Sequence, residues 1–111
     1  MKIGIVGNGY VGKATSMLCC EEKDLLIWDN DESKRNINDF KDLKACDFVF
    51  VCVPTPMFES GECDLSIVNF VVHELSQYDC IKRKVIVIKS TVVPGTTEQL
   101  AINYPDMNFV F

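Results

Sequence analysis

The sequence predicts an α/β protein of one domain, residues 1–111, in which a parallel sheet is doubly wound by helices. Three observations carry this prediction. A glycine-rich segment, GNGYVG (residues 7–12), directly follows a short apolar run; strand-like and helix-like segments then alternate along the chain; and Asp29 stands 22 residues after Gly7. Together they are typical of a Rossmann-type fold, whose parallel strands are joined by right-handed crossovers.

The first unit combines a strand, a glycine turn and a helix. Residues 2–6 predict a short strand, after which Gly7 permits a tight turn, Gly9 lacks the Cβ that would hold a phosphate away, and Gly12 lets the helix pack closely on the sheet. We expect this helix to bury four residues at helical spacing: Val11, Ala14, Thr15 and Leu18. The unit predicts a dinucleotide site in which backbone N–H groups face a pyrophosphate.

The second apolar run, residues 25–28, ends at Asp29. An acid at this spacing accepts hydrogen bonds from the adenosine ribose hydroxyls and repels a 2′-phosphate, which favours NAD over NADP. Lys34 and Arg35 follow closely and soften that exclusion. The alternative for Asp29 is a solvated acid at a strand end or a helix cap.

The remaining elements follow in order. Residues 48–53 predict a strand buried on both faces and closed by two prolines, and Asp64 caps a helix with one apolar stripe: Leu65, Val68, Val72 and Leu75. Residues 84–89 predict another buried strand, residues 97–102 a short helix, and residues 108–111 a final strand. Residues 30–40 are polar and short where a standard unit carries a helix and a third strand, so the crossover after the second strand is abbreviated.

Composition and charge argue against several classes of protein. A formal charge of -5, with no basic run longer than residues 82–84, disfavours nonspecific nucleic-acid binding. The longest apolar run, residues 48–53, is far too short to span a membrane, and no secretory signal precedes the glycines. We therefore expect a soluble, cytoplasmic protein without a metal site, whose cysteines are reduced and mostly at core positions: Cys19, Cys20, Cys46, Cys52 and Cys80.

Two residues admit a chemical role and an ordinary one. Cys63 lies in a loop, where it is either a nucleophile or redox thiol or simply a loop cysteine, since no positioned base is evident. His73, the only histidine, falls inside a predicted helix, which favours a structural or surface role over catalysis.

Three motifs in order, MKIGIVGNGYVG, ACDFVFVCVPTP and VIKSTVVPGTT, resemble the N-terminal NAD-binding domain of the UDP-glucose and UDP-mannuronate type of nucleotide-sugar 6-dehydrogenase. That family oxidises the C6 alcohol of a UDP-sugar to a carboxylate in two NAD-dependent steps, through a covalent thiohemiacetal. The order of the motifs disfavours an NAD-dependent β-hydroxyacid dehydrogenase, which shares the glycine segment.

The resemblance implies roles for particular residues. The pyrophosphate is lined by the glycine segment: Gly7, Gly9, Tyr10, Val11 and Gly12. Asp29 and Lys34 hold the adenosine ribose, and Thr55 flanks the cofactor. Thr91 is expected near the nicotinamide and the reacting centre, where a hydroxyl can donate and accept a hydrogen bond; the alternative is a strand-end threonine bonded to local backbone.

The chain also departs from the family pattern. The family's NPEFL-type glutamate, its nucleophilic cysteine with the neighbouring lysine, and its catalytic aspartate have no counterpart here, so no catalytic residue is assigned. We expect an NAD-binding domain of modest affinity that does not complete the reaction by itself. It is either truncated or supplied with its catalytic half by a separate chain, and it would self-associate through apolar residues such as Phe109 and Phe111. The alternative is a stand-alone dinucleotide-binding or interaction module.

Overall fold

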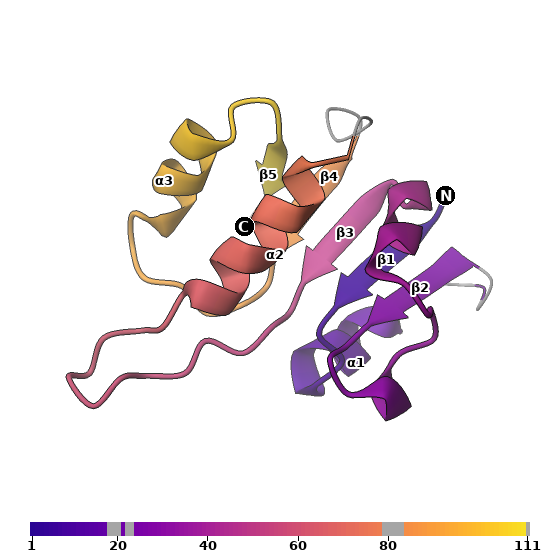
Figure 1. Ribbon diagram of the computed structural model, residues 1–111, viewed down its shortest axis with the longest axis horizontal. Helices are drawn as coiled ribbons and strands as arrows, with labels where there is room; N and C mark the ends of the chain where they lie inside the picture. The colour runs from indigo at the N-terminus through magenta and orange to yellow at the C-terminus, as the bar shows by residue number, and fades with distance from the viewer. Residues whose placement is uncertain (18–20, 22–23, 79–83, 111) are drawn as a thin grey trace.

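The computed structural model describes residues 1–17, 21, 24–78 and 84–110. Its centre is a five-stranded parallel sheet in the order β2-β1-β3-β4-β5, with helices on both faces (Figure 1). The strands are β1 (Ile3–Val6), β2 (Leu25–Trp28), β3 (Phe48–Val51), β4 (Val85–Ile88) and β5 (Asn108–Val110). The helices are α1 (Tyr10–Ser16), α2 (Ser66–Ser76) and α3 (Thr96–Asn103). The fold class predicted from the sequence is confirmed.

The core lies between the sheet and α2. In β3 and β4 alternate residues are buried, with Val49 and Ile86 fully inaccessible on the face that α2 covers. The predicted apolar stripe of α2 is confirmed for Val68, Val72 and Leu75, which are also fully buried. On the opposite face the side chains of β3 and β4 are only half-buried: Phe48, Phe50, Val85 and Val87. The prediction that the strand at residues 48–53 is buried on both faces is therefore wrong for this face.

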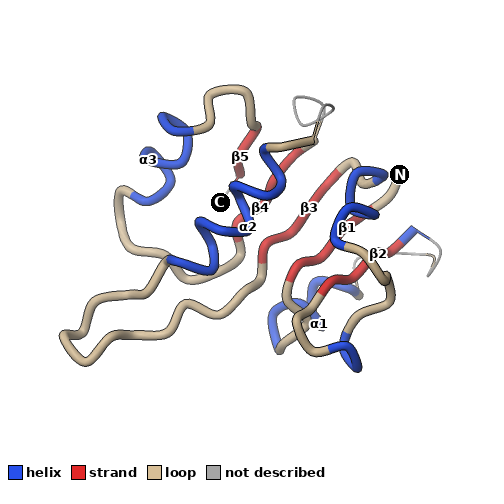
Figure 2. Tube along the Cα trace, viewed as in Figure 1, coloured by secondary structure: helices blue, strands red, loops and turns tan. Residues whose placement is uncertain are grey.

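The crossover from β2 to β3 is abbreviated, as predicted. Residues 29–47, which the structure describes throughout, contain no α-helix and no strand, only two short 3-10 helices, η2 (Glu32–Lys34) and η3 (Phe40–Ala45) (Figure 2). η3 packs on the sheet through Leu43, which is fully buried. A Cβ on Gly4 would lie 2.9 Å from the Leu43 side chain, so this glycine lets η3 approach β1 closely.

The predicted inner face of α1 is confirmed for Thr15 and wrong for Val11 and Ala14. Val11 is 49% exposed and Ala14 is exposed, whereas Gly12 and Thr15 are buried. The reason is the contact between the helix and the glycine turn: a Cβ on Gly12 would lie 2.0 Å from the Gly7 carbonyl oxygen. This approach turns Gly12 inward and rotates Val11 toward the end of the sheet. Leu18 lies outside the described residues.

Smaller differences concern ends and cysteines. β3 and β4 are shorter than predicted, ending at Val51 and Ile88. The predicted cap is wrong: Asp64 accepts a hydrogen bond of 2.9 Å from the Ser66 amide, but Leu65 occupies the N-cap position of α2 and no side chain caps it. Cys46, Cys52 and Cys63 are free thiols. Several predicted features fall outside the described residues: Cys19, Cys20, Cys80, the basic residues 82–83 and Phe111.

Candidate functional site

A cleft of about 1240 Å³ opens at the carboxyl ends of the strands. Its lining residues follow β1, β2, β3 and β4 directly, and α2 supplies a further wall. The chain leaves β1 for α1 on one face of the sheet and leaves β3 for α2 on the other (Figure 1). Ligands of open parallel sheets bind at this kind of switch point, so the cleft is the candidate site.

The glycine turn forms the floor of the cleft. Gly7 has a φ of +95°, and a Cβ there would lie 2.7 Å from the Cys52 carbonyl oxygen, so only glycine fits. At Gly9, by contrast, no atom stands within 4 Å of the Cβ position, which leaves its backbone open to the cleft. No side chain caps the start of α1 beside it. A flat backbone with uncapped amides fits a pyrophosphate.

Asp29 lies at the tip of β2 on the cleft wall, where the sequence placed it. One carboxylate oxygen accepts a hydrogen bond from the Asn8 amide at 2.8 Å, and the other accepts one from the Asp31 amide at 2.9 Å. The carboxylate therefore joins the glycine turn to the turn after β2. A carboxylate has about four lone-pair positions, so it can still accept hydrogen bonds from ribose hydroxyls.

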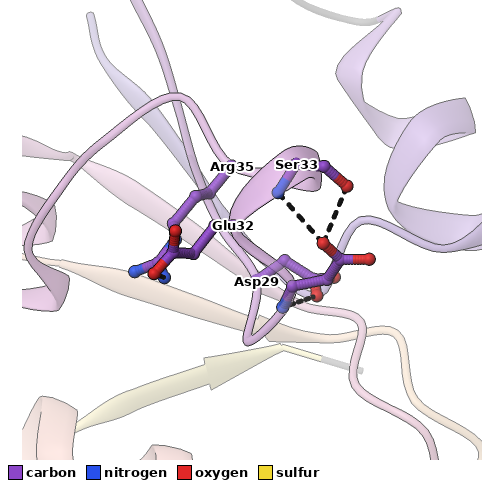
Figure 3. Close-up of polar contacts among 5 residues, drawn as sticks. Asp29, Glu32, Ser33 and Arg35 are labelled. Atoms are coloured by element: carbon purple, nitrogen blue, oxygen red, sulfur yellow. Dashed lines mark hydrogen bonds and ion pairs between the residues drawn. The ribbon is translucent and has the colours of Figure 1, made fainter.

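The turn after β2 adds a second acid to the same wall. The Asp31 carboxylate accepts hydrogen bonds from the Ser33 hydroxyl at 2.7 Å and the Ser33 amide at 3.0 Å (Figure 3), and these bonds hold the pKa of Asp31 below its usual value. Lys34 also lines the cleft. The wall thus presents two carboxylates and one lysine.

Arg35 is engaged elsewhere. Its guanidinium carbon lies 4.2 Å from the centroid of the Trp28 ring, and it forms an ion pair of 3.4 Å with Glu32 (Figure 3). Arg35 is not among the residues that line the cleft. The cation best suited to a 2′-phosphate is therefore held against an aromatic ring, which favours a ribose with a free 2′-hydroxyl.

Thr55 and Thr91 meet beyond the ends of β3 and β4. Both line the main cleft and also an adjoining cavity of about 810 Å³. The Cys63 thiol lies between them, 3.7 Å from the Thr55 carbonyl oxygen and 3.8 Å from that of Thr91. Thr91 follows β4, which lies three strand spacings from β2, or roughly 14 Å along the sheet edge. The cleft thus brings both threonines to the end far from Asp29.

Two of the residues predicted for the site do not line the cleft. Tyr10 is 97% exposed, and Gly12 is buried beneath the turn, where it acts through packing on Gly7. The other seven do line it: Gly7, Gly9, Val11, Asp29, Lys34, Thr55 and Thr91.

Sequence reasoning missed the wall that α2 contributes. Its residues stand at i, i+3, i+4 and i+7 beside the core stripe: Ile67, Phe70, Val71 and Glu74. Phe70 is 64% exposed although it is a large apolar side chain on a core helix. The spacing of this second stripe could have been recognised in the sequence and would have predicted a second contact face on this helix. Asn8 and Asp31 were also missed, because their contacts are set by the turns and leave no periodic pattern.

The other candidate residues lie outside the cleft or are inert. His73 is exposed on α2, and its ring nitrogen lies 3.5 Å from the Tyr104 hydroxyl. Burial raises the pKa of Cys46 to about 11 and also raises that of Cys52. Within the described ranges no three His, Cys, Asp or Glu residues gather as a metal site would require. Among the same residues, no helix combines the length and apolar character needed to cross a membrane.

The family model of the UDP-glucose/GDP-mannose dehydrogenase family, NAD binding domain, matches residues 35–108. The chain belongs to this family. The resemblance seen in the sequence is thereby confirmed, and NAD is the cofactor of this domain. The glycine floor and the acid at the tip of β2 fit that cofactor.

A curated relative, UDP-N-acetyl-D-mannosamine dehydrogenase of Methanocaldococcus jannaschii, is 30% identical and the match covers 89% of this chain. The alignment spans 129 positions, more than the 111 residues of this chain, so the relative carries residues that have no counterpart here. The chain covers 30% of that relative's length. This domain is therefore similar to one part of a longer enzyme.

Solved structures show the same fold. The UDP-D-ManNAc dehydrogenase of Pyrococcus horikoshii superposes with a TM-score of 0.82 at 20% identity, covering 98% of this chain and 34% of that one. The GDP-mannose dehydrogenase of Pseudomonas aeruginosa, in a ternary complex, gives 0.75 at 21% identity, covering 99% and 35%. Both similarities extend over nearly all of the described chain.

Proposed function

We propose that this chain, residues 1–111, is the cofactor domain of a nucleotide-sugar 6-dehydrogenase and binds NAD along the cleft. The observation that carries the proposal is the Asp29 carboxylate, which stands at the tip of β2 and bonds to the glycine turn through the Asn8 amide. This hydrogen bond joins the residue proposed to bind the ribose directly to the turn proposed to bind the pyrophosphate. Bound NAD would supply the hydride acceptor for oxidation of an alcohol.

Each group then has one task. Backbone at Gly7 and Gly9 receives the pyrophosphate, with Val11 beside it, while Asp29 and Lys34 bind the adenosine ribose. Thr55 and Thr91 orient the nicotinamide end through their hydroxyls.

In the proposed enzyme the reaction is oxidation of a UDP-sugar C6 alcohol to the carboxylate. We propose that residues 1–111 do not carry out this reaction by themselves, because the family's nucleophile and sugar-binding residues have no counterpart among their motifs.

The test is a calorimetric titration of the chain with NAD and with NADP. Asp29→Ala removes a charged acceptor of ribose hydroxyls, which is worth about 1.5–3 kcal/mol, so we expect NAD affinity to fall tenfold or more. Asp29→Asn keeps an oxygen acceptor but loses the charge, and should narrow the preference for NAD over NADP. Asp42→Ala is the matched control, because this exposed acid on η3 does not line the cleft. Equal binding of NAD by the wild type and Asp29→Ala would refute the assignment.

We further propose that a separate catalytic chain or a second copy covers the apolar surface of this domain. Phe48 and Phe50 are half-buried on the sheet face opposite α2, and Val110 in the edge strand β5 is 49% exposed. Phe109, expected to be exposed, instead packs against the core. Light scattering across a concentration series tests self-association, and a monomer at every concentration would contradict it.

A further inference from the structure

The outer edge of β2 is where this chain differs most from a sheet with a third strand. β2 is the terminal strand of the sheet and pairs with β1. The Trp28 carbonyl accepts a hydrogen bond from the Gly7 amide on the β1 side, so the peptide groups of Leu25 and Ile27 point outward. Outward peptide groups on an edge strand need partners or water, and they invite pairing with other chains.

Asn36 covers this edge. Its side-chain oxygen accepts a hydrogen bond from the Ile27 amide at 2.6 Å, and its side-chain nitrogen donates to the Leu25 carbonyl at 2.8 Å. Its own backbone amide donates to the Ile27 carbonyl at 3.0 Å. One residue therefore makes three of the hydrogen bonds that a neighbouring strand would make. Asparagine suits this position because its amide carries a donor and an acceptor side by side.

The loop closed by Asn36 is the ribose wall of the cleft. Between β2 and Asn36 lie four lining residues: Asp29, Asn30, Asp31 and Lys34. The loop leaves β2 at Asp29 and returns to β2 at Asn36, so Asn36 fixes its far end. In the middle, the Asn8 side chain donates a hydrogen bond of 2.8 Å to the Lys34 carbonyl. These contacts stand where a standard unit has a packed helix and strand.

We propose that Asn36 is a positioning residue for NAD, because it closes the outer edge of β2 in place of a third strand and so holds the loop that carries Asp29 and Lys34. This inference rests on the cofactor site proposed above. If the loop is in its binding geometry in only a fraction of the molecules, the apparent dissociation constant for NAD rises in inverse proportion to that fraction. Replacing Asn36 should therefore weaken binding at the ribose end of the cofactor, although Asn36 itself does not line the cleft.

The experiment compares the wild-type chain with Asn36→Ala by calorimetric titration with NAD and with ADP, which keeps the adenine, the adenosine ribose and the pyrophosphate but lacks the nicotinamide riboside. Two exposed side-chain hydrogen bonds are lost, and we expect both affinities to fall about fivefold. Trp28 is the only tryptophan and lines this wall, so acrylamide quenching of its fluorescence should increase. Asn103→Ala is the matched control: it removes a side-chain bond to Gln99 at the end of α3 and should change neither reading.

A second variant keeps the test decisive if Asn36→Ala folds poorly. Asn36→Asp retains an acceptor for the Ile27 amide but sets a carboxylate against the Leu25 carbonyl, so it should lose affinity for both nucleotides as well. If either folded variant lowers only the urea midpoint and binds NAD and ADP as the wild type does, Asn36 is structural and the inference is overturned. A wild type that binds neither nucleotide would instead overturn the cofactor site itself.

Discussion

Gly9 and Gly12 belong to one motif, yet replacing each by alanine should have opposite consequences. A Cβ on Gly12 would lie 2.0 Å from the Gly7 carbonyl oxygen and 3.0 Å from its carbon. Both are backbone atoms, so relief requires α1 to move about 1 Å or more away from the turn. Such overpacking costs about 3 kcal/mol, which for a domain of this size lowers the melting temperature by roughly 10–20 °C.

Gly9→Ala should leave folding nearly intact. No atom lies within 4 Å of its Cβ position, so the free energy of unfolding should change by less than about 1 kcal/mol. The new methyl stands where the pyrophosphate approaches the backbone and would hold it beyond the 3.2 Å limit of an N–H···O bond. Losing one charge-assisted hydrogen bond costs about 1.5–3 kcal/mol, so NAD affinity should fall tenfold or more.

The assay pairs urea unfolding, followed by Trp28 fluorescence, with calorimetric titration of NAD. Gly95→Ala is the control, because Gly95 has a φ of +91° and lies outside the cleft. It should lose about 1 kcal/mol of stability through backbone strain and keep its NAD affinity. The reasoning fails if Gly12→Ala unfolds at the wild-type urea concentration, or if Gly9→Ala binds NAD as tightly as the wild type.

Three further predictions concern the core. The buried Lys84 ammonium donates to the carbonyls of Lys44 and Cys46, so Lys84→Met should lower the urea-derived free energy of unfolding by about 2–4 kcal/mol; an unchanged midpoint contradicts this. Burial raises the pKa of Tyr78 from 10.0 to about 12. The neutral phenol therefore stabilises the fold below pH 10, and this stabilisation declines as the pH rises toward 12. Urea denaturation across this pH range should show the decline in the wild type and not in Tyr78→Phe. Cys46, with a pKa of about 11, should resist iodoacetamide in the native state by peptide mapping, and rapid alkylation would refute its burial.

The fold was predictable because its strands are short apolar runs bounded by turn residues. The apolar run at residues 48–53 predicts a strand, and Pro54 limits how far it can extend, although β3 already ends at Val51. The rotation of α1 was not predictable from periodicity. Apolar spacing placed Val11 inside, but the approach of Gly12 to the Gly7 carbonyl decides which side of this short helix faces the sheet. A contact between backbone atoms leaves no trace in a hydrophobic pattern.

The site was predictable where one residue type is required and not where a contact is made by side-chain geometry. Gly7 and Asp29 follow from steric and charge requirements at fixed spacing, and the structure places both on the cleft. The bonds of Asn36 to β2 connect residues nine and eleven apart through a side chain. Asparagine in a polar segment predicts only a turn, so the role of Asn36 becomes visible only in the folded structure.

The abbreviated crossover bears on affinity in a specific way. The sequence suggests that a shorter wall weakens NAD binding by removing part of the pocket, but the wall residues are present. Trp28 packs edge-on against Phe40 of η3 with ring centroids 5.9 Å apart, and Phe40 in turn contacts Tyr78 at 6.4 Å. The short segment therefore supports the end of β2 with an aromatic stack and closes its edge with one asparagine. The helix and strand of a standard unit would add further contacts to this loop, so we expect NAD affinity to depend on the few contacts that hold the loop in its binding geometry.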